Sequence, residues 1–407
     1  MLTRHVLGLA LHPALEQVQA AVLLIEGLGL DLRAELVQFH QESIPDDVQT
    51  LLVGLVSGGA LEARHLTTGH RALSEMLAAA ALHALDRAGM SLANVLCLGL
   101  DNLVLCHDGE APVPTQLTLG AAGLVAERTG VTVVGDFAGR DLASHGQGMS
   151  LAALPHFLLF RAPEKDRAVL SIREWSEATL LPRTAEVDRI RGGLAGPGTW
   201  LLDSLVQQMT GGQSRSDPQG RHAVQGRLLP ALLERWLHHP LVMKRWPRSA
   251  PRSTFGVEFA RQTILLAQQQ GWTAHDVLCT SHHFVAVAAV QSLRQAAGRE
   301  ADRGREVVLC GAGSRNGFLW RLLEELEPGW RFVRSDDLGW PAAAVQAAVA
   351  ALLAALALDG EPANLPAVTG ARGARLLGHF TPGALANWSS CLDWMTGRWE
   401  FAYRRAG

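Results

Sequence analysis

The densest group of polar side chains lies in residues 136–148, DFAGRDLASHGQG, directly after the apolar segment VTVV. Side chains that follow a strand of an α/β domain line the crevice in which such domains bind ligands. The segment therefore predicts a substrate pocket built from five side chains: Asp136, Arg140, Asp141, His145 and Gln147. An arginine–aspartate network that only holds a glycine-rich loop explains the same residues equally well.

Two glycine turns could bind a nucleotide. CGAGSRNG, residues 310–317, follows an apolar strand and opens a helix, so its backbone amides could face an anion or a ribose. GPGTW, residues 196–200, is a second glycine turn at the start of a predicted helix. Neither turn has the lysine of a P-loop. Taken alone, each pattern favours a tight strand-to-helix turn over a binding site.

Other catalytic chemistries find no support in the sequence. The neighbouring pairs His238–His239 and His282–His283 cannot each face one metal ion, and no HExxH motif accompanies them. The five cysteines have no CxxC spacing and lie mostly in apolar segments, which indicates reduced, buried thiols. No GxSxG motif marks an activated serine. We therefore predict no metal ligand and no nucleophile.

Composition and pattern predict an α/β protein with a large core. The 407 residues are 48% hydrophobic and 18% charged, with a formal net charge of −3, which argues against disorder and against nucleic-acid or membrane partners. Strands are expected within residues 5–39, 93–100 and 131–137, and helices over 70–88 and 119–130. This alternation of strand and helix is typical of a parallel sheet.

A second block of elements is expected from about residue 134. RAVLSIRE and EATLLPR resemble a hairpin, helices are predicted over 226–239 and 257–269, and residues 305–326 form a strand, a glycine turn and a helix. The alanine-rich segment 340–360 is predicted to be a buried helix rather than a membrane span. Proline interrupts MLTRHVLGLALHP before a signal sequence can form, so a cytoplasmic location is expected.

Several segments, in order, resemble the 1,6-anhydro-N-acetylmuramic acid kinase family up to about Gly383. They are GLVAERTGVTVVGDFAGRDLASHGQG, CGAGSRNGFL, DDLGWPAAAVQA, NLPAVTGA and LLGHFTPG. The resemblance implies an α/β fold of two actin-like (RNase H-like) domains with a cleft between them. It places the first domain at residues 1–133 plus 372–383 and the second at 134–371. Residues 384–407 are then a tryptophan-rich extension, and a homodimer would fit the family.

The resemblance also assigns binding residues. On the sugar side of the site, this sequence retains three side chains that the resemblance implies bind the substrate: Arg140, Asp141 and Gln147. On the nucleotide side it retains five residues: Gly196, Gly198, Gly311, Gly313 and Asn316.

The groups that the family's chemistry needs are replaced. The phosphate-binding hairpin of the family aligns with residues 8–23. Its glycines and hydroxyl residues correspond here to Leu11, His12, Pro13 and Ala14, and its two aspartates correspond to Glu16 and Gln19. A second glycine pair becomes Arg173 and Glu174, and a glutamate becomes Gln346. A sugar-side His-Gly-Gln segment falls on residues 100–104. Leu194 occupies the position of the general base, and leucine cannot accept a proton.

These losses predict a pseudokinase without a catalytic residue and without a cofactor, which binds a muropeptide-derived sugar or a protein partner. Losing the base alone costs about 10²–10⁴-fold in rate, and losing charge-stabilising groups costs a comparable factor. The rival is an active sugar kinase that uses ATP and Mg²⁺, with the base or metal ligand supplied by one of Glu16, Asp101, Glu174 and Glu177. A third reading is an interaction protein whose cleft is filled by its own side chains, Arg173 and His12 among them.

Overall fold

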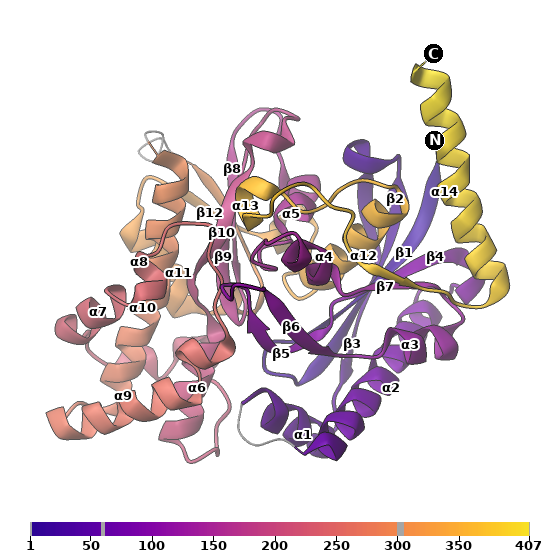
Figure 1. The fold of residues 1–407 in the computed structure, drawn as a ribbon. Helices are drawn as coiled ribbons and strands as arrows, with labels where there is room; N and C mark the ends of the chain where they lie inside the picture. Colours follow the sequence, from indigo (N-terminus) through magenta and orange to yellow (C-terminus); the bar gives the residue numbers. More distant parts are fainter. Residues whose placement is uncertain (1, 58–61, 299–304, 407) are drawn as a thin grey trace.

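The computed structural model describes residues 2–57, 62–298 and 305–406, with side chains as far as residue 397 (Figure 1). Its first sheet has six strands in the order β13-β7-β4-β1-β2-β3. β1, β2 and β3 are antiparallel neighbours, and β4 and β7 run parallel to β1. The strands are β1 (Thr3–Leu11), β2 (Gln17–Glu26), β3 (Arg33–Ser43), β4 (Val95–Leu100), β7 (Val133–Gly135) and β13 (His379–Thr381).

Both faces of the first sheet are buried, and β1 shows how the sequence achieves this. Successive side chains of a strand point to opposite faces. Leu7 and Leu9 pack in the cluster that includes helix α2 (Ala63–Arg87), whereas Val6 and Ala10 pack in the cluster that includes α12 (Val345–Leu358). Apart from Gly8, the strand is therefore apolar from Val6 to Leu11.

The second sheet repeats the topology of the first. Its order is β10-β9-β8-β11-β12, with β8, β9 and β10 antiparallel and β11 and β12 parallel to β8. The strands are β8 (Arg167–Ile172), β9 (Trp175–Leu181), β10 (Arg191–Pro197), β11 (Glu306–Cys310) and β12 (Arg331–Arg334). This duplicated arrangement of three antiparallel and two parallel strands confirms the predicted actin-like α/β fold.

The remaining elements surround the two sheets (Figure 1). Those near the first sheet are α1 (Asp46–Val56), hairpin β5 (Leu103–Asp108) and β6 (Thr115–Leu119), α3 (Ala122–Thr129) and α4 (Phe137–Ala143). Helix α5 (Ala153–Phe160) contacts strands of both sheets, and α13 (Pro366–Thr369) contacts β10 of the second sheet. Those of the second part are α6 (Thr199–Met209), α7 (Pro230–Leu237), α8 (Pro240–Met243), α9 (Val257–Gln270), α10 (Ala274–Ala297) and α11 (Gly317–Leu326). Within the described parts of the chain no helix is long and apolar enough to cross a bilayer.

Helix α12 is the buried alanine-rich helix that the sequence predicts. It lies within the residues predicted for the second domain, yet it packs against β1 and β4 of the first sheet. The contact depends on two glycines: a Cβ on Gly8 would lie 1.8 Å from the carbonyl oxygen of Ala347, and one on Gly99 would lie 2.0 Å from that of Ala350. The helix therefore contacts the strands backbone to backbone, and Gln346 at its start is left at the cleft.

The tryptophan-rich extension forms helix α14 (Leu385–Ala406), which docks on the body (Figure 1). Asn387 accepts a hydrogen bond from the backbone amide of Thr132 at 2.7 Å. Trp394 donates from Nε1 to Asp359 at 3.0 Å, and the guanidinium of Arg4 lies 4.5 Å from the centre of its ring. Trp388 also packs against the core, whereas the side chain of Trp399 lies outside the described ones.

Candidate functional site

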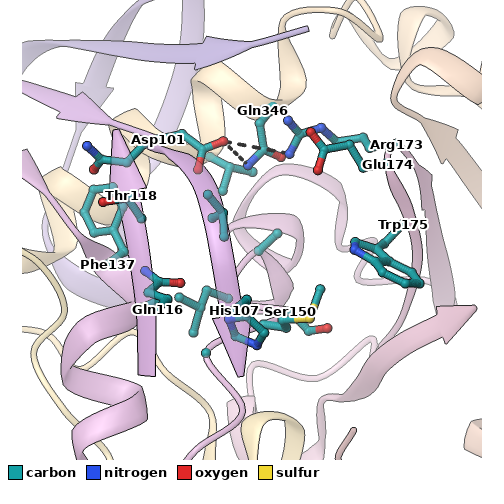
Figure 2. Close-up of a pocket in the computed structure, with 18 of the residues that line it drawn as sticks. Asp101, His107, Gln116, Thr118, Phe137, Ser150, Arg173, Glu174, Trp175 and Gln346 are labelled. Carbon is teal, nitrogen blue, oxygen red and sulfur yellow. Dashed lines mark hydrogen bonds and ion pairs between the residues drawn. The ribbon is translucent and has the colours of Figure 1, made fainter. Parts of the chain in front are cut away.

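A cavity of about 210 Å³ lies between the two sheets, where β4 and β7 end. Hairpin β5–β6 and the start of α4 form one wall, and the β8–β9 turn forms the facing wall (Figure 2). Helix α12 closes one end of the cavity with Gln346. Parallel strands of α/β domains present ligand sites at their carboxyl ends. This space, the cleft cavity, is therefore the candidate ligand site.

Arg173, at the tip of hairpin β8–β9, connects the two sheets across the cleft. Its Nη2 donates to the carbonyl oxygen of Leu11 at 3.2 Å, and its Nη1 lies 3.8 Å from Oδ2 of Asp101. Gln346 donates to the same Asp101 oxygen at 2.9 Å (Figure 2). We call this group the Arg173 bridge. It ties β8–β9 to the ends of β1 and β4 with one cation and one carboxylate.

The Arg173 bridge lies between the cleft cavity and a second cavity of about 320 Å³. Arg173 and Gln346 line both spaces, together with Ser171. The second cavity is bounded by the β1–β2 turn on one side and by the turn after β11, with Gly311, on the other. It lies between the elements to which the family resemblance assigns nucleotide binding.

The β1–β2 turn uses its own amides internally. The amide of Leu15 donates to the carbonyl oxygen of His12 at 2.8 Å, and that of Ala14 donates to Nδ1 of His12 at 3.3 Å. Pro13 has no amide proton. Burial lowers the pKa of His12, so its ring stays neutral near pH 7 and offers no positive charge to an anion. The turn therefore presents neither free amides at these positions nor a cation to a phosphate.

Glu174, beside Arg173, is held in an ion pair. Arg252 donates from Nε to Glu174 Oε2 at 3.0 Å and contacts Oε1 as well. The same guanidinium donates from Nη1 to the carbonyl oxygen of Val104 on β5 at 3.0 Å. Arg252 thus joins hairpins β5–β6 and β8–β9 along the wall of the cleft cavity. The Glu174 carboxylate is neutralised there and is not a free base.

Two carboxyl groups of the cleft cavity are shifted toward their protonated forms. Burial raises the pKa of Asp101, and the nearby Arg173 and Gln346 offset part of this effect. Burial also raises the pKa of Glu177, although Ser150 donates to its Oε1 from both the backbone amide and Oγ at 2.9 Å. A carboxyl group of this kind can act as a general base if its pKa approaches the working pH.

The three side chains predicted to bind the sugar lie beside the cleft cavity, and none of them is among the described residues that line it. Asp141 is buried and accepts from the amide of Gly148 and from Asn364, each at 2.8 Å. Gln147 accepts from Ser249 at 2.6 Å, and Arg140 is exposed. Asp141 and Gln147 hold the loop whose following residues, from Gly148 to Ala152, line the cavity.

Of the five residues predicted to bind nucleotide, one lines the second cavity, one caps a helix and three allow close packing. Gly311 lines the second cavity, and Asn316 caps α11 by accepting from the amides of Phe318 and Leu319. Gly196, Gly198 and Gly313 serve close packing: a Cβ would meet Ala288 at 2.9 Å, the carbonyl oxygen of Arg173 at 2.2 Å and Ile172 at 2.2 Å, respectively.

Leu194, which the family resemblance places at the position of the general base, is fully buried in the core of the second sheet. Its carbonyl oxygen accepts from Trp246 Nε1 at 2.6 Å and from Arg248 Nε at 2.8 Å. Across the ladder it pairs with Glu177 of β9. The position that the resemblance assigns to the base is therefore apolar, and a carboxyl group lies on the neighbouring strand.

Sequence reasoning did not single out several residues of the cleft cavity. His107 and Gln116 come from hairpin β5–β6, which the sequence analysis did not predict, and Trp175 begins β9. Burial lowers the pKa of His107, so it is neutral near pH 7. Arg252 belongs to residues 242–254, a polar, basic segment between the helices predicted over 226–239 and 257–269. The alternating polarity of residues 115–119, TQLTL, is the one signal that could have found part of this wall.

The sequence profile described as "Anhydro-N-acetylmuramic acid kinase" matches residues 4–383. The chain belongs to this family. Curated family members include anhydro-N-acetylmuramic acid kinases of a Cyanothece strain, 31% identical with 92% of this chain and 99% of that protein covered, and of Thiobacillus denitrificans, 33% identical with 89% and 93% covered. Among solved structures, (R)-2-hydroxyglutaryl-CoA dehydratase component A of Acidaminococcus fermentans matches with a TM-score of 0.43 and 14% identity, over 86% of this chain and 99% of that one.

Proposed function

We propose that this family member has lost phosphoryl transfer from ATP and binds a small sugar in the cleft cavity. The Arg173 bridge is the observation that carries the proposal. The family resemblance places bound phosphates between the β1–β2 and β8–β9 turns, and Arg173 spans that space with a bond to the carbonyl oxygen of Leu11 at 3.2 Å. A phosphate chain would have to displace this guanidinium from two partners.

The rest of the machinery supports the same conclusion. Phosphoryl transfer depends on oriented donors around the phosphates and on a group that accepts the proton of the attacking hydroxyl. Here the amides of Ala14 and Leu15 are used within the β1–β2 turn, and the base position holds the buried Leu194. Loss of either function costs about 10²–10⁴-fold in rate, and both losses together leave little catalysis.

The lining of the cleft cavity suits an uncharged sugar. Trp175 and Phe137 lie on facing sides and offer apolar surfaces, while Asp101, Gln116 and Glu177 offer polar groups to hydroxyls (Figure 2). The lining includes four carboxyl groups and two guanidiniums. Both guanidiniums are already paired with carboxylates of the lining. A ligand carboxylate would therefore meet excess negative charge, and we expect a neutral anhydro amino sugar to bind more tightly than its acidic lactyl ether.

Calorimetric titration tests this proposal with three ligands: a magnesium complex of a non-hydrolysable ATP analogue, 1,6-anhydro-N-acetylglucosamine and 1,6-anhydro-N-acetylmuramic acid. We expect no heat from the nucleotide at millimolar concentration and saturable heat from the neutral sugar. Trp175→Ala should weaken sugar binding at least about 10-fold, because it removes a stacking surface. Trp320→Ala, a matched change outside the cavity, should leave it unaltered. One-to-one nucleotide binding and turnover of either sugar would overturn the proposal.

One observation favours a second candidate, an active kinase with a rebuilt base. Glu177 pairs across the ladder with Leu194, lines the cleft cavity and has a raised pKa. If it is the base, Glu177 takes the proton of the attacking hydroxyl, the γ-phosphoryl group of ATP passes to the sugar and ADP leaves; Glu177→Gln then reduces this rate by about 10²–10⁴-fold. If the protein binds the sugar but mass spectrometry detects no phosphosugar in the presence of ATP, this candidate is rejected.

A further inference from the structure

Two histidines and a glutamate converge at the outer edge of the first sheet, away from the cleft. His40 and Glu42 are on β3, and His83 is on α2. Oε2 of Glu42 lies 2.9 Å from Nε2 of His40 and 2.6 Å from Nδ1 of His83. The three ligand atoms all lie within 4.8 Å of one another. The two imidazole rings meet edge to face with their centres 5.9 Å apart.

The fold explains why these side chains face each other. His40 and Glu42 are two residues apart on a strand, so both point to the same face of the sheet. Helix α2 packs on that face and presents His83 from its last two turns. The partners of His40 and Glu42 on β2 are Ala20 and Val18, which offer no competing ligand. β3 is an edge strand, so the cluster stays open to solvent.

We propose that His40, Glu42 and His83 form a binding site for a divalent late transition metal, with Zn²⁺ as the ion best matched by this donor set. Two imidazole nitrogens and one carboxylate oxygen are a known three-ligand set for Zn²⁺, and such sites leave a fourth position for water. Imidazole donors favour Zn²⁺, Cu²⁺ and Ni²⁺ over Mg²⁺ and Ca²⁺, which prefer oxygen ligands.

The exposed fractions of the three side chains suit a metal site that is partly fixed by packing and still open to ions from solvent. His40 is 8% exposed, Glu42 26% and His83 56%, so the cluster has one fixed ligand and one that can adjust. Metal binding requires both ring nitrogens to act as lone-pair donors, so the protons they now share with Glu42 leave or move to the other ring nitrogen. The bound ion would tie edge strand β3 to helix α2. None of the three residues lines the cleft cavity or the second cavity as the described residues define them.

The test uses the tag-free full chain after removal of metal with a chelator, titrated with ZnCl₂ in a calorimeter. We expect one Zn²⁺ per chain. His83→Ala and Glu42→Gln should each weaken binding by more than the 10–100-fold typical of losing an outer-shell partner, because each removes a direct ligand. His65→Ala, an exposed histidine on the same helix, is the matched control and should bind like the unaltered protein.

Cobalt(II) gives a second readout that does not depend on heats. Four-coordinate Co²⁺ absorbs visible light more strongly than the aqueous ion, so visible bands should appear in the unaltered protein and in His65→Ala and be absent in His83→Ala. His83 is more than half exposed, so its replacement leaves the core intact and the comparison interpretable. No binding by the unaltered protein, or equal Zn²⁺ affinity in His83→Ala, would show that the three residues form a metal-free hydrogen-bonded cluster.

Discussion

Removing Arg173 from the cleft should destabilise the protein by an amount that can be worked out from its contacts. Arg173→Ala deletes one hydrogen bond to the Leu11 carbonyl and one ion pair with Asp101. The guanidinium is 24% exposed and the carboxylate 34%, so both interactions are partly screened by solvent. The variant tests whether the Arg173 bridge holds the two sheets together in solution.

The expected magnitude is about 2–3 kcal/mol of unfolding free energy. A hydrogen bond from a charged donor contributes about 1.5–3 kcal/mol, and the 3.2 Å length of this one favours the lower value. A partly exposed ion pair adds about 1 kcal/mol. By contrast, Arg261→Ala removes an exposed helical ion pair with Glu258 and should cost far less, because water screens this pair.

Urea-induced unfolding of Arg173→Ala, Asp101→Asn and the double variant isolates the pair in a double-mutant cycle. The amide oxygen introduced by Asp101→Asn can still accept the hydrogen bond from Gln346, so the cycle reports the Arg173–Asp101 interaction. We expect a coupling of about 1 kcal/mol. A coupling below about 0.3 kcal/mol, with Arg173→Ala no more damaging than Arg261→Ala, would refute the bridge.

Three further predictions concern stability, each measured by urea-induced unfolding. The folded-state pKa of Glu177 is raised, so the stabilising contribution of this residue is lost as pH rises through that pKa. Glu177→Gln should therefore be more stable than the unaltered protein at pH 7. The difference in unfolding free energy should shrink toward pH 4. Burial lowers the pKa of His156 from 6.5 to about 4, so protonation of the unfolded chain should remove about 2 kcal/mol between pH 7 and pH 5, and His156→Leu should abolish this slope. Gly8→Ala should cost about 3 kcal/mol, because its Cβ would lie 1.8 Å from the carbonyl oxygen of Ala347, whereas Gly54→Ala, with open space, should not destabilise.

Local patterns predicted the strands and helices that have strong apolar periodicity. Hairpin β8–β9 and the buried helix α12 were both expected from such patterns. Strand β10, RGGLAGP, was missed because three glycines and a proline give it little intrinsic strand preference, and pairing with β9 decides its conformation. Only the family resemblance predicted the repeated topology of the two sheets, because that topology resides in strand order and direction rather than in shared residues.

The sequence predicted which residue types stand at the candidate site, but it did not predict the tertiary contacts that these residues make. The replacement of glycine by Arg173 was visible in the sequence, but its reach to Leu11, 162 positions away, is a tertiary distance. Arg252 belonged to a loop with no periodic pattern, and its ion pair with Glu174 exists because two hairpins meet. Asp141 shows why residue type alone did not decide between two roles: a polar residue after a strand can hold a loop as readily as it can bind a ligand.

Arg173 and Glu174 of the cleft have partners of their own, and under the proposed function this limits how nucleotide binding could be restored. Restoring glycine at position 174 would leave Arg252 beside the cavity with the Val104 carbonyl and no carboxylate partner from that hairpin. Restoring glycine at 173 would leave Asp101 with Gln346 alone and raise its pKa further. Each single reversion thus removes a structural interaction without recreating the β1–β2 turn, whose amides remain internally bonded. Nucleotide binding should therefore reappear only when both turns are restored together, and single glycine variants should lose stability without gaining affinity for ATP.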